Sequence, residues 1–279
     1  AAAKAALSVL SVAATPSETM SSFSFLSASG DTRDFRSTQL RGGDNPNDTG
    51  LYLEGLVAYQ RYNPVFIFPD IAPDTELDVT WASVAGTIGV GWDFPIGRGW
   101  VIRPTGHASL GHVSGDALLV DGPFASRQTD GVDAVDRSLN AFGAGASVTF
   151  VREAEYGAWT AEYRLRQTYM EFYPFNEANV GDAKATSNQT SGFARHRYSL
   201  KNLKLFDQDT RLVLDAGVVF YHGDEAKVLK TDWIATAGVG LEVDTSQTGL
   251  PYVTAGRVML NAVVGEDFDG FSVGLGLRF

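Results

Sequence analysis

Ten long segments of the chain alternate apolar residues with small or polar ones, and this pattern limits the possible folds more than any other feature. In "TWASVAGTIGVGWDF" (80–94), Val84, Ile88, Val90 and Trp92 all fall on even positions. A period of two is that of a β-strand, whose successive side chains point to opposite faces. The other nine segments are 51–62, 100–114, 138–151, 158–172, 189–203, 210–223, 232–244, 250–264 and 270–279, and two weaker ones are 21–29 and 34–40.

These strands are long, and the connections between them alternate in length. A strand tilted by about 45° needs roughly 9 to 11 residues to cross a hydrocarbon core, which these segments provide. Four connections are tight turns (95–99, 153–157, 206–209, 245–249), whereas most others are longer and acidic (63–78, 115–137, 173–187). Short turns on one rim and long loops on the other are typical of transmembrane barrels. We therefore predict an all-β, antiparallel up-and-down barrel of about twelve strands, with ten as the alternative.

Composition narrows the class of protein further. The 279 residues contain no linker-like stretch, so we expect one barrel domain over 20–279 after an N-terminal segment 1–19. No run of about 18 apolar residues is present, which excludes a transmembrane helix. The net charge of −11 argues against a nucleic-acid partner, and the absence of cysteine removes thiolate metal sites. We predict no metal site and no cofactor.

The charged residues of the strands share one face in this register, and arginine predominates among them. Planar guanidinium groups can bridge strands across a polar lumen, whereas the opposite faces are nearly uncharged at mid-strand and carry aromatic residues near their ends. We therefore place the apolar faces toward lipid. The predicted lumen-lining residues are Arg103, Glu162, Arg164, Arg166, Arg195, Arg197, Lys201, Asp215, Glu242, Arg257 and Arg278, and Glu54, Asp93 and Arg211 share their face.

Four arginines on neighbouring strands stand out in this set: Arg164, Arg166, Arg195 and Arg197. They are expected to pair with Glu162, Asp215 or a plug, in a structural role. The set holds nine basic and five acidic residues, so an open lumen would pass small anions more readily than cations. Twelve strands leave a narrow interior, which side chains and a plug can also close.

The first residues, "AAAKAALSVLSVAATPSE", leave two interpretations open. Lys4, the apolar stretch 5–12 and the small residues 12–14 fit the remnant of a signal peptide. The alanines equally favour a short helix, which at 1.5 Å per residue would fill about 21 Å of the lumen.

The chain ends in "GFSVGLGLRF", where Phe271, Val273, Leu275, Leu277 and Phe279 alternate with small or polar residues. This ending resembles the C-terminal signature that bacterial outer-membrane proteins present to their insertion machinery. With about twelve strands and a helix-capable N-terminal stretch, the chain resembles the translocator domain of autotransporters, and more narrowly a solitary barrel without a passenger, since fewer than about 50 residues precede the first strong strand.

The resemblance implies a monomeric pore, translocator or structural protein of the Gram-negative outer membrane, without enzyme activity. Its partners would be the bilayer, lipopolysaccharide and the barrel-assembly machinery. Counting from the C-terminus, an even strand number would place both termini on the periplasmic rim, together with the short turns.

Two enzymatic alternatives also follow from the sequence. His112 and Ser114 lie two apart on an outward face, with Asn140 on the next strand, and resemble the His-x-Ser pair of outer-membrane phospholipase and lipid A deacylase. In those families Asn follows the serine, whereas here Gly115 does. The similarly spaced His107 and Ser109 share a face with Arg103 and are expected to point inward. A barrel-type protease would need clustered Asp and His, for which His222 with Asp224 is the nearest match.

Overall fold

The computed structural model describes residues 2–18, 23–30, 33–45, 49–67, 76–119, 138–175, 183–205, 207–246, 254–266 and 269–278. Two helices, α1 (Ala2–Ala14) and α2 (Asp224–Leu229), accompany thirteen strands. Neither helix is both long and apolar enough to cross a membrane. The strands are β1 (Phe23–Gly30), β2 (Arg33–Asp44), β3 (Leu51–Ile67), β4 (Glu76–Trp92), β5 (Phe94–Gly97), β6 (Trp100–Leu119), β7 (Leu139–Tyr156), β8 (Trp159–Pro174), β9 (Ala185–Leu205), β10 (Gln208–Tyr221), β11 (Trp233–Asp244), β12 (Ala255–Gly265) and β13 (Asp269–Arg278).

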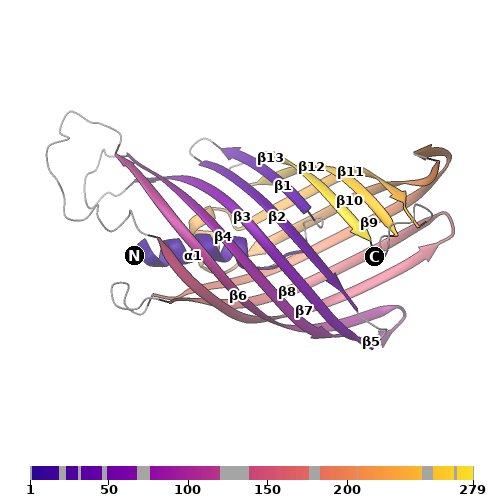
Figure 1. Cartoon of the computed structure of the whole chain (residues 1–279), viewed down its shortest axis with the longest axis horizontal. Coiled ribbons are helices and arrows are strands. Elements are labelled where there is room, and N and C mark those ends of the chain that lie inside the picture. Colours follow the sequence, from indigo (N-terminus) through magenta and orange to yellow (C-terminus); the bar gives the residue numbers. More distant parts are fainter. Residues whose placement is uncertain are drawn as a thin grey trace.

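Twelve of these strands form a closed antiparallel ring, and the four-residue β5 is a short addition that pairs with β6 (Figure 1). Each ring strand pairs with its neighbours in the chain, β4 pairs with β6, and β1 pairs with β13 to close the circle. The predicted up-and-down barrel of twelve strands is confirmed. The strands β3, β6 and β9 extend to 17, 20 and 21 residues, so they run several residues into segments predicted as loops.

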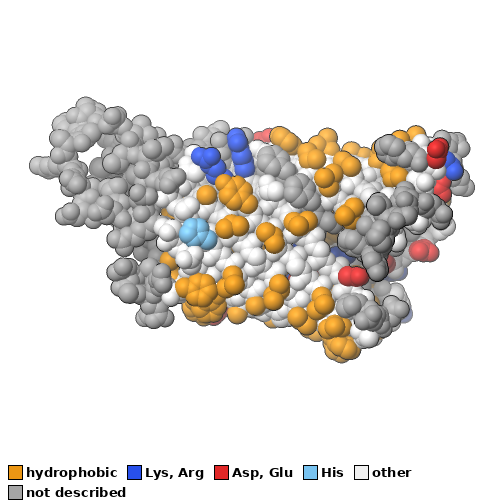
Figure 2. Space-filling view, in the orientation of Figure 1, with side chains coloured by type: hydrophobic (Ala, Val, Ile, Leu, Met, Phe, Trp, Pro, Cys, Tyr) orange, Lys and Arg blue, Asp and Glu red, His pale blue; other side chains and the backbone are white. Residues whose placement is uncertain are grey.

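The apolar set of β4 and that of β6 point away from the lumen. Ile88 of β4 is 66% exposed and Leu110 of β6 is 62% exposed, whereas the alternate residues of both strands are buried. Figure 2 shows apolar side chains spread over the side of the barrel, with most of the visible acidic ones toward the end of the barrel at which β5 lies in Figure 1. Phe271, Val273, Leu275 and Leu277 belong to this exterior, at 37–54% exposure, and Phe279 lies outside the described residues.

The two rims differ in their connections. The hairpin between β5 and β6 turns through Gly97, Arg98 and Gly99, all with positive φ (93°, 54° and 76°), a conformation that glycine adopts without steric cost. Gly157 (φ 63°) and Asp207 (φ 61°) make the tight turns after β7 and β9. β13 ends at this short-turn rim, whereas β6 and β10 end, and β7 and β11 begin, at the opposite rim, which we call the long-loop rim (Figure 1).

Helix α1 lies inside the barrel, in the half of the lumen nearest the long-loop rim (Figure 1). Leu7, Val9, Leu10 and Ala13 are at most 2% exposed and pack against apolar lumenal side chains, among them Trp81. A helix of 13 residues is marginal on its own in water, so this packing is what holds it. In this structure residues 2–14 thus form a helix in the lumen, and the half of the lumen that it fills is largely apolar rather than a continuous polar channel.

Helix α2 packs beside the N-terminal end of α1. Lys4 Nζ lies 2.9 Å from Asp224 Oδ1, and Tyr62 of β3 donates a hydrogen bond of 2.7 Å to the carbonyl of Val228. Glu225 is fully buried and accepts hydrogen bonds from Ser187 Oγ (3.0 Å) and from the backbone N–H of Asn188 (2.9 Å). These contacts join α1, α2, β3 and β9 at the long-loop rim.

This placement bears on the predicted position of the two termini. The even strand number does put the start of β1 and the end of β13 toward the same rim. The helix before β1, however, folds back through the lumen, so its N-terminal end lies at the long-loop rim and the end of β13 at the other (Figure 1). The two ends of the described chain therefore lie at opposite rims of the barrel.

Candidate functional site: the charged half of the lumen

Hydrogen bonds from four strands fix the course of α1 and the residues after it. Thr87 Oγ1 donates to the carbonyl of Ala14 (2.6 Å), and Thr15 Oγ1 donates to Ser187 Oγ (2.9 Å). Gln60 donates to the carbonyl of Val9, and Arg41 donates to that of Ser17. These bonds direct the chain to the middle of the barrel, where Glu18 meets the charged residues of the wall.

Glu18 lies among three arginines from two strands. Its carboxylate is 2.8 Å from Arg41 Nη2 of β2, and 3.1 and 3.0 Å from Nη1 of Arg164 and Arg166 of β8. Burial by itself raises the pKa of Glu18, but Arg41, Arg164 and Arg166 together hold that pKa well below its usual value. Glu18 therefore remains ionised and ties the segment after α1 to both sides of the barrel.

A second carboxylate, Glu54 of β3, completes this cluster. It lies 2.6 Å from Arg166 Nη2 and 3.5 Å from Arg41 Nη2, and accepts a hydrogen bond of 3.2 Å from the hydroxyl of Tyr52. His107 Nδ1 is 3.3 Å from Glu54, and its Nε2 is 3.0 Å from Arg166 Nη2. Removing one member of such a buried network leaves the others uncompensated, which typically costs about 3–5 kcal/mol.

Two cross-strand rows of alternating charge line the wall from β8 to β12. In the first row Arg195 of β9 stands opposite Glu162 of β8 and Asp215 of β10, and its Nε and Nη2 each donate to Asp215 at 2.7 Å. In the second row Glu242 of β11 stands between Arg211 of β10 (3.1 Å) and Arg257 of β12 (3.3 Å).

Arg197 of β9 links the two rows. Its Nη2 is 2.7 Å from Glu162 and its Nε is 3.4 Å from Glu242. Opposite charges that face each other across neighbouring strands stabilise a sheet, and a closed ring presents them at fixed spacing. The rows therefore brace the β8–β12 part of the barrel.

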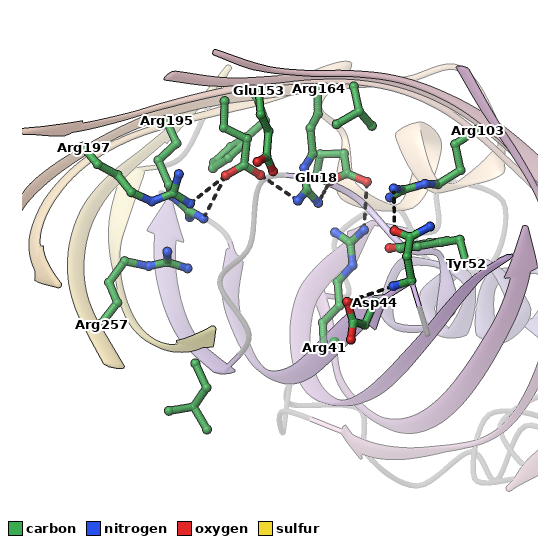
Figure 3. Close-up of a pocket in the computed structure, with 17 residues that line it drawn as sticks. Glu18, Arg41, Asp44, Tyr52, Arg103, Glu153, Arg164, Arg195, Arg197 and Arg257 are labelled. Atoms are coloured by element: carbon green, nitrogen blue, oxygen red, sulfur yellow. Dashed lines mark hydrogen bonds and ion pairs between the residues drawn. The ribbon is translucent and has the colours of Figure 1, made fainter. Parts of the chain in front are cut away.

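A cavity of about 280 Å³ lies in this half of the lumen, toward the short-turn rim (Figure 3). Figure 3 shows the guanidinium groups of Arg195, Arg197 and Arg257 on one side and Arg41, Arg164 and Arg103 on the other. Arg103 is held by Asp93 (Nη2 to Oδ2, 2.7 Å) and lies 3.6 Å from the ring centroid of Tyr52. The lumen thus has an apolar half that contains α1 and a polar half that contains this cavity.

Nine of the eleven predicted lumen-lining residues have described side chains. Arg103, Glu162, Arg166, Arg195 and Glu242 are at most 9% exposed. Arg164, Arg197, Asp215 and Arg257 join the same network. The side chains of Lys201 and Arg278 are not among those described.

Sequence reasoning missed Glu18 and Arg41, the two residues that tie the N-terminal segment to the wall. The strand of Arg41 was predicted to end at residue 40. Extending the alternation of Ser37 and Gln39 by one more step would have placed Arg41 on the same lumenal face. No pattern in the sequence near Glu18 predicts its contact with the wall of the barrel. The exterior is also not free of charge, because Arg36 and Arg61 are exposed and stand opposite each other on β2 and β3.

Of the residues named in the enzymatic alternatives, His107 belongs to this site, next to Glu54 and Arg166, whereas His112 and Ser114 lie outside it. His107 and Ser109 point inward, at 5% and 4% exposure. On the outside, His112 Nδ1 is 2.8 Å from Asn140 Oδ1, but within the described residues no hydrogen bond joins His112 to Ser114.

His222 and Asp224, the nearest match to a barrel-type protease, also contact different partners. His222 Nε2 is 3.1 Å from Thr190 Oγ1, whereas the carboxylate of Asp224 is 2.9 Å from Lys4 Nζ and accepts a hydrogen bond from the backbone N–H of Thr186. Among the side chains that the structure describes, no group of three or more His, Asp or Glu is placed to hold a metal ion.

Comparison with known proteins identifies the fold of the chain but no family. No family model and no curated protein matches the chain. Among solved structures, the chain is similar to the β domain of the Bordetella autotransporter BrkA, with a TM-score of 0.51 and 15% identity over 92% of this chain and 97% of that one. It is similar to LpxR from Salmonella typhimurium at a TM-score of 0.51 and 11% identity, over 92% and 99% of the two chains. The fold is thus that of bacterial outer-membrane β-barrels, including an autotransporter β domain.

Proposed function

We propose that this chain is an outer-membrane barrel of the translocator type, whose lumen is closed by its own N-terminal helix. The exterior supports a membrane location, because large apolar side chains such as Ile88 and Leu110 stand exposed along the strands. In a bilayer these side chains contact hydrocarbon, and closure of the ring leaves no unpaired strand edge.

The observation that carries the proposal is the path of α1. The helix and the residues that follow it run from the long-loop rim, where Lys4 contacts Asp224, to the middle of the lumen, where Glu18 contacts Arg166. Any segment joined to the N-terminal end of α1 would emerge at the long-loop rim. We propose that this rim faces the cell exterior and that β13 ends at the periplasmic rim, since long loops are extracellular in bacterial outer-membrane barrels.

Planar-bilayer conductance tests whether α1 closes the pore. We expect low, intermittent conductance from the full chain and a steady open pore after deletion of residues 2–14. The double substitution Leu7→Asp with Leu10→Asp should also open it, since both leucines are at most 1% exposed and a buried unpaired carboxylate is strongly disfavoured. The open pore should prefer anions, as its charged half is rich in arginine.

The matched control for this experiment is Val12→Asp, at a helix position that is only partly buried. It should open the pore less than the leucine pair does. Each variant is first checked for the folded barrel by its heat-modifiable mobility in SDS gels. Equal conductance of the full chain and the deletion variant would rule out α1 as the plug.

Cysteine labelling tests the orientation, and the cysteine-free chain supplies a clean background. Lys4→Cys at the long-loop rim should react with a membrane-impermeant maleimide in intact cells, because the side chain of Lys4 is 52% exposed. Lys204→Cys near the short-turn rim, with a side chain 62% exposed, should react only after the outer membrane is permeabilised. The reverse pattern would invert the proposed orientation.

The proposal includes a monomeric barrel without enzyme activity, inserted by the barrel-assembly machinery through its C-terminal strand and surrounded by phospholipid and lipopolysaccharide. Within the described residues no hydrogen bond joins His112 to Ser114, which supports a non-enzymatic role, although the contact of His112 with Asn140 keeps a lipid hydrolase as the alternative. Phospholipid or lipid A turnover in micelles by wild type but not by Ser114→Ala would establish the alternative instead.

A further inference from the structure

The cavity in the polar half of the lumen is lined by more arginines than carboxylates. Its lining includes four carboxylates, Glu18, Asp44, Glu153 and Glu162, and six arginines, and carboxylates outside the lining, among them Asp215 and Glu242, also pair with these arginines. The six arginines are Arg41, Arg103, Arg164, Arg195, Arg197 and Arg257.

The carboxylates nearest to Arg257 are already shared among several arginines. Glu162 is within 4 Å of Arg164, Arg195 and Arg197. Glu242 is likewise shared by Arg197, Arg211 and Arg257. Arg257 has the weakest pairing with a carboxylate, because its one hydrogen bond to a described carboxylate is a 3.3 Å contact with Glu242. Its charge is therefore the least compensated in the cavity wall.

Three guanidinium groups converge on the same space. In Figure 3, Arg195 and Arg197 of β9 point toward Arg257 of β12, and no dashed line joins Arg257 to the other residues drawn. The side chains of Arg195 and Arg257 are only 8% and 9% exposed, so packing fixes their positions. Gly276 of β13 makes room for Arg257, because a Cβ atom there would lie 2.6 Å from its Nη2.

We propose that this cavity binds a small dianion, a phosphate group, between Arg195, Arg197 and Arg257. Guanidinium groups recognise phosphate oxygens through paired, charge-assisted hydrogen bonds, and a phosphate, which carries about −1.5 to −2 charges at neutral pH, would offset the repulsion among the three converging guanidinium groups. A cavity of 280 Å³ accommodates a phosphate with a small substituent. The site lies beyond α1 on the short-turn side, and Arg195, Arg197 and Arg257 pair with carboxylates of the strands rather than with Glu18.

Isothermal titration of the full, refolded chain in micelles with inorganic phosphate tests this site, and glycerol phosphate as a second probe distinguishes free phosphate from a phosphomonoester. The informative pair of variants is Arg257→Gln and Arg211→Gln. Both arginines pair with Glu242, at 3.3 and 3.1 Å, and each substitution leaves Glu242 two other arginines. Arg211 is not part of the cavity lining, so it controls for loss of an arginine from the same row.

We expect both wild type and Arg211→Gln to bind phosphate with affinities within about twofold of each other, and Arg257→Gln to bind about tenfold more weakly. Glu153→Gln removes a carboxylate from the lining and should tighten binding. Heat-modifiable mobility confirms that each variant is folded. Absence of phosphate binding by wild type, or equal weakening in Arg257→Gln and Arg211→Gln, would overturn the proposal.

Discussion

At the scale of the residue, glycines on inward faces make room for the charged side chains. Gly89 of β4 stands beside Glu54 and His107, and a Cβ atom at this position would lie 2.7 Å from Glu54 Cγ and 2.8 Å from His107 Nδ1. Three residues earlier, Gly86 belongs to the outward set and has no atom within 4 Å of the corresponding position. The same residue type thus serves packing at one site and is unconstrained at the other.

Gly89→Ala should therefore destabilise the barrel by about 1–3 kcal/mol, because the added methyl group displaces Glu54 from its buried partners. Gly86→Ala should be neutral or stabilising by up to about 1 kcal/mol, through fewer conformations of the unfolded chain. Urea titration of both variants in micelles, followed by tryptophan fluorescence, measures the difference. Equal stability of the two variants would contradict the packing role of Gly89.

At the scale of the element, α1 and α2 depend on each other and on the barrel. α2 has only six residues, yet Asp224, Glu225, Val228 and Leu229 are all buried. Burial raises the pKa of Asp224, but hydrogen bonds from Lys4 and the backbone N–H of Thr186 outweigh it and lower that pKa overall. Burial raises the pKa of Glu225 above its usual value, despite the hydrogen bond from Ser187. Two adjacent carboxylates therefore respond to pH in opposite directions.

Because the pKa of Glu225 is raised in the folded state, its protonated form stabilises the fold. This contribution is fully present below the ordinary carboxyl pKa and is lost as pH rises through the raised value. Glu225→Gln, which mimics the protonated form, should protect the α2 amides from hydrogen exchange more than wild type at about pH 7 and equally at about pH 4. Asp224→Asn should weaken protection near neutral pH, because the Asp224 contribution is present above its ordinary pKa and lost only as pH falls through the lowered value. The same direction of change in both variants would refute this assignment.

At the scale of the whole molecule, the closed ring separates an apolar exterior from a lumen of two halves. Lipid hydrocarbon surrounds the barrel only between the two rims. The free-energy cost of a charged side chain on the exterior should therefore depend on its position along the strand. Ile88 of β4 and Ile96 of the hairpin β5–β6 provide a test, since both are exposed (66% and 55%) but Ile96 lies at the short-turn rim.

Ile88→Arg should reduce the free energy of folding into phosphatidylcholine vesicles by about 2–4 kcal/mol, and Ile96→Arg by about 0–1 kcal/mol. Equilibrium refolding from urea into vesicles, read from heat-modifiable mobility, gives both values. A cost for Ile96→Arg as large as that for Ile88→Arg would place the short-turn rim inside the hydrocarbon layer.

Much of this architecture follows from the sequence, because a strand's two faces are encoded by alternate residues. The alternation at 80–94 and at 270–279 predicted strands, the outward set and the twelve-stranded ring. The same parity placed Arg195 and Glu242 on the lumenal face, because a one-residue slip in register would turn the apolar residues of their strands away from the lipid. Gly-rich turns such as 95–99 marked the short-turn rim.

Other features were decided only by the tertiary structure. The segment 1–19 had two open interpretations, since an alanine-rich helix gains its stability from whatever it packs against. Only the closed lumen, with Trp81 and Leu56 facing inward, supplies that surface, and it moves the N-terminal end of α1 to the rim opposite β13. The contact of Glu18 with Arg41, Arg164 and Arg166 likewise arises only when the ring brings β2 and β8 around the helix, because no sequence pattern spans such separations.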